Sequence, residues 1–239
     1  MRRQTNKRIY WNNKLAYVIG LITTDGNLSK DKRHINFTSS DIQLINTFKS
    51  CLNKNNFITL NPFSERTKKQ SYKFQFGDVS FYDFLMRIGL YPNKSLTIDK
   101  INVPNKYFRD FLRGHLDGDG SIIFYKDKYN TDKNPKYVYD RLFVYFISAS
   151  IKHVIWLQKN IHNLIDIRGS LNKQVWKKKK KTVIYRLKFS TKQAKIILNW
   201  IYYKPDLPCL LRKYLIARPF LTPSSPTFLK KKFKKEEMI

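Results

Sequence analysis

The sequence predicts an α+β protein built from two pseudo-symmetric units of the order αββαββα, packed against each other through one helix of each unit. Two segments that lie 94 positions apart repeat one pattern: residues 17–27 read YVIGLITTDGN, and residues 111–121 read FLRGHLDGDGS. Each is an apolar helical run with a central glycine that ends in Asp-Gly. The segments after each copy also repeat, and a 239-residue chain with 42% hydrophobic residues can build the cores that two units require.

The first unit is expected to cover residues 11–95, after a basic arm at residues 1–10. Helices are predicted from the spacing of apolar residues, and strands from alternation such as that in Lys73-Phe74-Gln75-Phe76. Asp41 is expected to cap the second helix, whose core positions are Leu44, Ile45, Phe48 and Leu52. The expected elements are a helix at 11–24, strands at 27–29 and 35–39, a helix after 41, strands at 57–60 and 71–76, and a helix at 80–90.

A linker at residues 96–104 leads to the second unit, residues 105–220, and a flexible basic tail follows at 221–239. After its motif helix we expect strands at 121–125 and 142–148, a helix at 151–165, strands at 169–176 and 182–189, and helices at 193–203 and 208–217. Asp25 and Asp119 differ by 94 positions, whereas Phe37 and Phe146 differ by 109. The second unit therefore carries a 15-residue insertion, which we place as a basic loop at 126–140.

The two motif helices are predicted to meet at Gly20 and Gly114, because neither residue has a side chain to keep the backbones apart. Asp25 and Asp119 then come together at the negative ends of two helix dipoles, where two carboxylates repel each other and resist ionisation. A divalent cation resolves that conflict, and oxygen ligands favour Mg²⁺. Such a metal polarises a phosphodiester and activates water. The glycine after each aspartate is expected in the left-handed conformation that ends a helix.

The composition indicates a polyanionic partner. The chain has 47 Lys and Arg against 17 Asp and Glu, a net charge of +30 and a pI near 10.1. This excess favours nucleic acid, since no basic amphipathic helix that would bind a membrane surface stands out. We expect Cys51 and Cys209 to be buried, reduced thiols, and the four histidines show no zinc-site spacing. His115 is expected to pack at or beside the seam. No apolar segment typical of a signal peptide follows the basic N-terminus, which favours an intracellular protein.

The paired segments resemble the motifs of the LAGLIDADG homing endonucleases, in the monomeric form with two motifs on one chain. The resemblance extends from about residue 11 to residue 220 and implies a two-sheet saddle on double-stranded DNA. It also implies a long asymmetric target, cut in both strands across the minor groove to leave short 3′ overhangs. The catalytic, metal-binding acid of the eighth motif position is Asp25 in one copy and Asp119 in the other. The sixth position is Thr23 in the first copy, a departure from the name sequence, and Asp117 in the second.

The resemblance also implies residues around the two acids. Thr24 and Gly118 are expected to join the aspartates as metal ligands, and Mn²⁺ is expected to replace Mg²⁺, whereas Ca²⁺ binds without supporting cleavage. Residues that order the attacking waters match Gln75 and Lys188, with Lys188 as a cation for the transition state. Ser39 and Ser148 stand where Gln or Lys is expected. The residues expected to contact DNA are Lys30, Lys32, Arg33, Asn36, Lys73, Gln75, Lys126, Lys128, Lys173, Arg186 and Lys188, with the lysine run at 177–181 as a phosphate clamp.

Two alternatives remain at this stage. One is a non-cleaving LAGLIDADG nucleic-acid binder, either a DNA-binding regulator or an intron RNA maturase, although retention of Asp25 and Asp119 favours the enzyme. The other is an intein-embedded nuclease. The sequence shows no splicing block with an N-terminal Cys or Ser and a terminal His-Asn, so an intron-encoded, free-standing enzyme is preferred.

Overall fold

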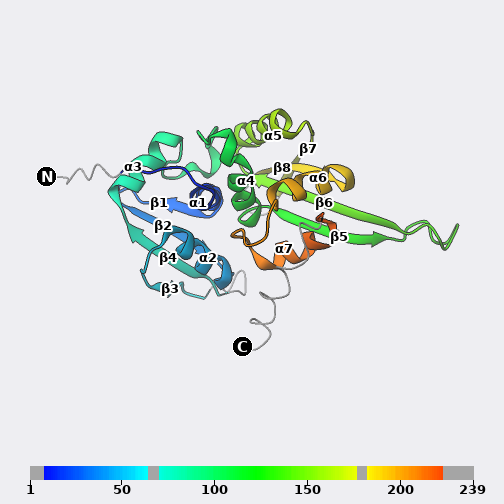
Figure 1. Ribbon diagram of the computed structural model, residues 1–239, viewed down its shortest axis with the longest axis horizontal. Coiled ribbons are helices and arrows are strands. Elements are labelled where there is room, and N and C mark those ends of the chain that lie inside the picture. Colours follow the sequence, from blue (N-terminus) through cyan, green and yellow to red (C-terminus); the bar gives the residue numbers. More distant parts are fainter. Residues whose placement is uncertain (1–7, 64–69, 177–181, 223–239) are drawn as a thin grey trace.

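The computed structural model of the chain describes residues 8–63, 70–176 and 182–222 (Figure 1). Most of the predicted N-terminal arm and C-terminal tail, and the whole lysine run at 177–181, lie outside these ranges. The described residues confirm the predicted α+β class, with two four-stranded antiparallel sheets of equivalent order, β1-β2-β4-β3 and β5-β6-β8-β7. None of the described helices is long and apolar enough to cross a membrane.

The first unit follows the predicted order. Its elements are α1 (Asn13–Thr24), β1 (Gly26–Leu28), β2 (His34–Ser39), α2 (Ile42–Leu52), β3 (Ile58–Leu60), β4 (Tyr72–Gly77) and α3 (Val79–Ile88). Side-chain caps set the helix starts. The Asn12 side chain accepts the N–H of Leu15 at 2.8 Å, so α1 begins at Asn13 rather than at residue 11. Asp41 caps α2 as predicted, and Asp78 caps α3.

The second unit repeats this order after two short 3₁₀ turns, η1 (Lys94–Leu96) and η2 (Asn105–Tyr107). Its elements are α4 (Phe108–Asp117), β5 (Ser121–Asp127), β6 (Tyr139–Ser148), α5 (Ile151–Ile165), β7 (Ser170–Trp176), β8 (Thr182–Ser190), α6 (Thr191–Ile201) and α7 (Leu211–Ala217), followed by the turn η3 (Arg218–Phe220).

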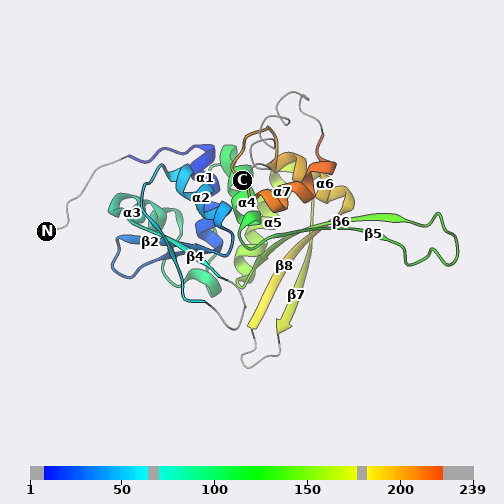
Figure 2. The same ribbon diagram turned by 90° about the horizontal axis from the view of Figure 1, so that it is seen from below.

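The predicted loop at 126–140 is wrong in its extent, because strands continue into it. β5 runs to Asp127 and pairs there with Tyr139 at the start of β6. Two ion pairs join the strands beyond the body of the protein: Arg141 to Asp127 at 2.8 Å and Lys126 to Asp140 at 3.0 Å. The resulting hairpin projects away from the rest of the chain in both views (Figures 1 and 2).

A single apolar core joins the two units, and it includes the predicted core positions of α2. His115 is buried, but its ring turns toward α5 and stacks on His153 at 5.2 Å between ring centroids. The prediction of buried cysteines is wrong in degree: Cys51 and Cys209 are free thiols that are only half-buried, because they pack at the margin of the core.

The seam between the units is formed by α1 and α4, which lie side by side in the middle of the molecule (Figure 1). Residues Leu15–Thr23 of α1 are all buried. A Cβ built on Gly20 would lie 2.1 Å from the carbonyl oxygen of Phe111, and one built on Gly114 would lie 2.1 Å from that of Tyr17. The two backbones are therefore in direct contact, and no larger residue fits at either position.

We predict that Gly20→Ala destabilises the protein by about 3 kcal/mol or more, although alanine is the better helix former by about 1 kcal/mol. The added methyl group can be accommodated only if the two helices separate, because the atom that it meets belongs to the backbone. Chemical denaturation measures the effect. Gly77→Ala is the matched control, since a Cβ there would meet only the side chains of His34 and Arg33, at 3.4 and 3.5 Å. Equal stability of the two variants would contradict the close seam.

Candidate active site and nucleic-acid interface

Asp25 and Asp119 come together where the two motif helices end. Asp25 is the C-terminal cap of α1 and is half-buried, while Asp119 follows α4 and is exposed on one side. A Cβ built on Gly118 would lie 2.9 Å from the Oδ2 atom of Asp25, so the ends of the two motifs are in contact. Burial and then the negative charge of Asp119 raise the pKa of Asp25 to about 7, and burial raises the pKa of Asp119.

The glycines that follow the aspartates have a different role from the predicted one. Neither Gly26 nor Gly120 has a positive φ; among the described glycines only Gly89 does, at the end of α3. A Cβ on Gly26 would instead lie 2.5 Å from the Cα of Ile22, and one on Gly120 would lie 2.6 Å from the carbonyl oxygen of Leu116. Both glycines are therefore required for the close return of the chain against its own motif helix.

Two buried lysines, Lys94 and Lys213, accompany the carboxylates, and each exposes only 4% of its surface. The ammonium group of Lys94 donates to the carbonyl of Gly26, and that of Lys213 donates to the carbonyl of Gly120 at 2.7 Å. The two lysines thus contact the residue after each aspartate and are related by the pseudo-symmetry. Burial lowers the pKa of each lysine to about 8, while the carboxylates of Asp25 and Asp119 act in the opposite direction.

Sequence reasoning missed both lysines. The available signal was a short repeat after the last long helix of each unit, where Lys94 and Lys213 are each followed two positions later by leucine. This signal is weak in a chain with 47 basic residues, of which most are solvated. Only the fold distinguishes the two lysines from the others, because it buries them beside the aspartates.

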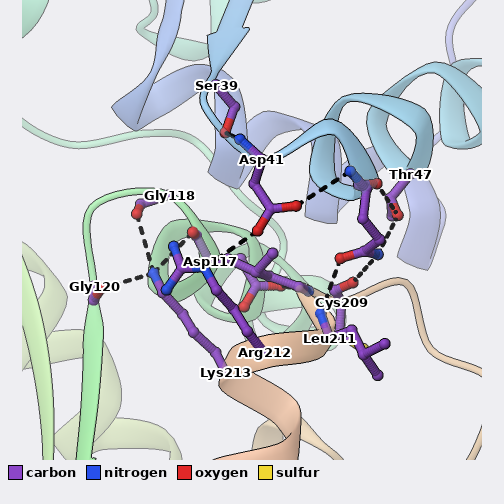
Figure 3. A network of polar contacts seen from close by, with 12 residues as sticks. Ser39, Asp41, Thr47, Asp117, Gly118, Gly120, Cys209, Leu211, Arg212 and Lys213 are labelled. Carbon is purple, nitrogen blue, oxygen red and sulfur yellow. Dashed lines mark hydrogen bonds and ion pairs between the residues drawn. The ribbon is translucent and has the colours of Figure 1, made fainter. Parts of the chain in front are cut away.

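A network of buried polar groups holds Lys213 in place (Figure 3). Its ammonium group also donates to the carbonyls of Leu116, Asp117 and Gly118, at 2.6, 2.8 and 3.1 Å, and so satisfies the open C-terminal end of α4. The Asp117 carboxylate accepts the hydroxyl of Tyr17 at 2.8 Å and the N–H of Leu210 at 2.7 Å. Asp117 therefore ties α1, α4 and the segment before α7 together.

The first unit also contacts this segment through α2. Gln43 donates to the carbonyl of Cys209 at 2.9 Å and accepts the N–H of Leu211 at 3.0 Å, and Arg212 pairs with Asp41 at 3.2 Å (Figure 3). Lys213, which belongs to the second unit, is thus positioned in part by the first. The site depends on both halves of the chain.

The donor set at the seam consists of oxygen atoms. Within the described part of the chain, no three His, Cys, Asp or Glu side chains cluster in a way that could hold a metal ion. The two carboxylates are the acidic ligands available, and the raised pKa of each fits a place where a cation would relieve their repulsion. Of the two residues predicted beside them, Thr24 donates its hydroxyl to the carbonyl of Leu21 at 3.0 Å, and the carbonyl of Gly118 accepts from Lys213.

The open face of the first sheet is polar. Phe37 pairs with Phe74, and both are buried against the helices, so the alternate residues point to the other face. That face carries Asn27, His34, Asn36, Thr38, Thr59, Lys73 and Gln75. The turn between β1 and β2 adds the exposed Lys30, Lys32 and Arg33. The structure thus brings together all of the DNA-contacting residues predicted in the first unit.

The open face of the second sheet is less polar than that of the first. The buried pair Phe146 and Leu187 marks its helix-covered side. On the opposite side, β5 and β6 carry mostly apolar and aromatic residues, namely Ile123, Tyr125, Tyr139, Phe143, Tyr145 and Ile147, with Ser121 and Arg141. On the same side, β7 and β8 carry mostly polar residues, namely Ser170, Asn172, Gln174, Arg186 and Lys188, with Ile184. Register points Lys126 and Lys173 away from the open face, where they pair with Asp140 and Tyr185, although both lysines are exposed. Lys128 lies in the turn beyond β5. β6 is mostly apolar from Leu142 to Ile147, so alternation alone did not reveal which side chains face outward.

The residues predicted to order water occupy equivalent places. Gln75 pairs with Asn36 in the first sheet as Lys188 pairs with Tyr145 in the second. The Lys188 ammonium group lies 4.2 Å from the ring centroid of Phe143, whereas the cations that act on the carboxylates are Lys94 and Lys213. The hydroxyls of Ser39 and Ser148 each accept the N–H two residues ahead, at 3.1 Å, which occupies both serines at the start of a helix.

We predict that Asp25→Asn stabilises the metal-free protein at pH 8 by about 1 to 3 kcal/mol. Because the pKa of Asp25 is raised, the folded state holds a proton that the unfolded state has lost between about pH 4 and pH 7. The free energy of unfolding of the wild type therefore falls as pH rises through this window. The variant does not show this decrease, because it has no carboxyl group at position 25. Denaturation in EDTA at pH 4 and pH 8 measures the difference. The exposed Asp132→Asn is the control, and a gain that is the same at both pH values would contradict the assignment.

Comparisons with known proteins agree with this geometry. Residues 12–89 match the LAGLIDADG-like domain family. The solved I-LtrWI LAGLIDADG homing endonuclease bound to target DNA superposes with a TM-score of 0.55 at 12% identity, over 87% of this chain and 89% of that one. Meganuclease I-SmaMI bound to uncleaveable DNA gives 0.55 at 10% identity, over 90% and 89% of the chains.

The N-terminal LAGLIDADG domain of DUF199/WhiA is also similar, with a TM-score of 0.51 at 16% identity over 87% of this chain and 94% of that one. No curated protein matches the sequence. The likeness to these structures reaches across both units, whereas the family match is confined to the first. Residues 12–89 of the first unit therefore match a LAGLIDADG-like domain, and the complete chain has a two-unit fold similar to that of the solved LAGLIDADG homing endonucleases.

Proposed function

We propose that this protein is a site-specific endonuclease that hydrolyses both strands of double-stranded DNA with a divalent metal ion. The observation that carries the proposal is the placement of Asp25 and Asp119 together at the seam, with one buried lysine beside each aspartate. This arrangement lies between two sheets in a chain with a net charge of +30, which attracts the DNA backbone.

Each half of the site supplies one aspartate and one lysine for the DNA strand that it faces. Asp25 and Asp119 would hold Mg²⁺, or Mn²⁺ in its place, with the backbone at Thr24 and Gly118 as further oxygen ligands. Such an ion supplies Lewis-acid polarisation of the phosphodiester and lowers the pKa of a bound water. Lys94 and Lys213 place positive charge beside the carboxylates, where it can stabilise negative charge that develops on the phosphate. Gln75 and Lys188 face the DNA from equivalent strands and would orient water or a phosphate.

The two sheets differ, so the target should be asymmetric and long, and one chain acts as a pseudo-dimer. The first sheet offers Asn36, Gln75 and Lys73 on its open face. Amide side chains pair with adenine and lysine pairs with guanine in the major groove. Cleavage at the seam, between the two sheets, would fall in the middle of the target and leave short 3′ overhangs.

A second function is a LAGLIDADG nucleic-acid binder that does not cleave. One observation favours it: the carbonyl of Gly118, a predicted metal ligand, accepts a hydrogen bond from Lys213. If that contact persists on DNA, the carbonyl has less capacity for a metal. The two functions differ in whether a bound duplex is cut.

We predict that purified protein enriches one long asymmetric sequence from a randomised duplex pool and cuts it in Mg²⁺, and that Ca²⁺ gives binding alone. Asp25→Asn/Asp119→Asn should bind the same sequence and leave it intact. Lys94→Met and Lys213→Met should each slow cleavage by about 100-fold or more, as expected when a charge that stabilises the transition state is lost. Lys152→Met, in α5 away from the seam, is the matched control.

Tight selection of one duplex with no cutting in Mg²⁺ or Mn²⁺ would overturn the endonuclease proposal and support the non-cleaving binder. Cutting that survives in the double aspartate variant would also overturn it, since the hydrolysis would then belong to another site or to a contaminant. If no duplex is selected, structured RNA is the next substrate to test, because an RNA-binding protein would show its affinity there.

A further inference from the structure

The open faces of the two sheets differ in chemistry at the equivalent strands β2 and β6. Pairing register aligns Asn36 and Gln75 of the first sheet with Tyr145 and Lys188 of the second. In the same way, Thr38 and Lys73 correspond to Ile147 and Arg186. On β8 both equivalent positions are therefore cationic: Arg186 replaces Lys73, and Lys188 replaces the uncharged Gln75. On β6, in contrast, a large apolar or aromatic residue replaces each polar residue of β2.

The apolar side chains on the second face form one connected surface, which we call the apolar platform: Ile123, Tyr125, Phe143, Tyr145 and Ile147. Tyr125 and Tyr145 both contact Phe143, with ring centroids 6.2 Å apart in each case. Ile123 pairs with Phe143 across the strands and exposes 44% of its surface, and Tyr125 exposes 49%. The helices of the second unit pack on the other side of this sheet, against buried residues such as Val144 and Leu187.

Positive charge borders the platform. Lys188 lies over the ring of Phe143. Arg186, on β8, pairs with Ile147 of β6. On the outer side, Arg141 lies 5.8 Å from the ring of Tyr139 and is held by Asp127 at 2.8 Å. Charges at the border and apolar groups in the centre suit a partner whose backbone is anionic and whose inner surface carries apolar groups. Duplex DNA presents such a surface in its major groove wherever thymine places its C5-methyl group.

We propose that the apolar platform reads its half of the DNA target through thymine methyl groups, so that this half-site is rich in A·T pairs. This inference rests on the proposed function, since it requires a DNA duplex on the second sheet. The first sheet can donate and accept hydrogen bonds with base edges, whereas the platform has few groups that can. If cytosine or guanine lay opposite Ile123 or Ile147, its polar edge would lose its hydrogen bonds to water and gain none from the protein, which is unfavourable for binding.

Single-stranded nucleic acid is a different partner that aromatic residues can bind by base stacking. The structure favours the duplex, because the ring planes of Tyr125 and Tyr145 are tilted by 39° and 44° to that of Phe143, and Lys188 covers one side of Phe143. The rings therefore support one another as a packed surface, with Ile123 beside Phe143 and Ile147 beyond Tyr145 along β6.

The experiment begins with the duplex that the wild-type protein selects in Ca²⁺. Selection is repeated with Ile123→Asn and with Ile155→Asn, a control isoleucine on α5 that is 51% exposed. The Ile123→Asn variant should change base preference in one half of the target only, which assigns that half to the second sheet. Deoxyuridine then replaces thymidine in either half, because it lacks only the C5-methyl group.

We expect deoxyuridine in the half assigned to the platform to weaken wild-type binding about threefold to fivefold for each contacted methyl group. The same replacement in the other half should have little effect. Deoxyuridine should weaken the binding of Ile123→Asn much less than that of the wild type, and it should weaken the binding of Ile155→Asn as much as that of the wild type. Thermal denaturation measures whether the two variants are equally folded. If they are, a smaller effect of deoxyuridine on Ile123→Asn alone reports the lost methyl contact and not a general loss of structure.

If deoxyuridine weakens wild-type binding equally in both halves of the target, or in neither half, the inference is overturned and the endonuclease proposal remains intact. A preference for unstructured RNA over the duplex that is lost in Ile123→Asn also overturns it, and identifies the platform as a stacking surface. Failure to select any duplex overturns both proposals.

Discussion

The close contact of α1 and α4 at Gly20 and Gly114 is the constraint on which the rest of the structure depends. It lets two backbones touch, and it therefore fixes the ends of the two helices at one place. Asp25 and Asp119 follow those ends, so two carboxylates that are distant in sequence share one partly buried environment. The contact also joins two units that are each too small to complete the site, since the elements around the aspartates come from both.

Such a pair of carboxylates destabilises the fold unless opposite charge is nearby. Lys94 and Lys213 provide that charge, and Lys213 also satisfies carbonyl groups that the C-terminal end of α4 would leave unpaired. Burial of an ammonium group is unfavourable, which is why the pKa of each lysine falls to about 8. Four titratable groups with displaced pKa values at one seam support the proposal of a catalytic centre there.

The fold and the position of the two aspartates could be predicted from the sequence because the relevant patterns are local. Helix periodicity, strand alternation and the repeated Asp-Gly are each visible within about ten residues. The buried lysines could not be predicted, because their burial results from tertiary packing of Lys94 and Lys213 against distant carbonyls. The role of Gly26 and Gly120 was also hidden, since a glycine after a helix is compatible with either a left-handed turn or a close backbone approach. In β6 the apolar run conceals which residues face outward, and the register with β8 resolves it.

The most direct test of the account is a carboxyl ¹³C NMR titration of the aspartates in the metal-free protein, with Asp119→Asn beside the wild type. The account predicts that Asp25 titrates near its pKa of about 7 in the wild type and at a lower pH in the variant, because the negative charge of Asp119 is gone. An Asp25 that titrates at the same pH in both proteins would show that the seam does not bring the two carboxylates together.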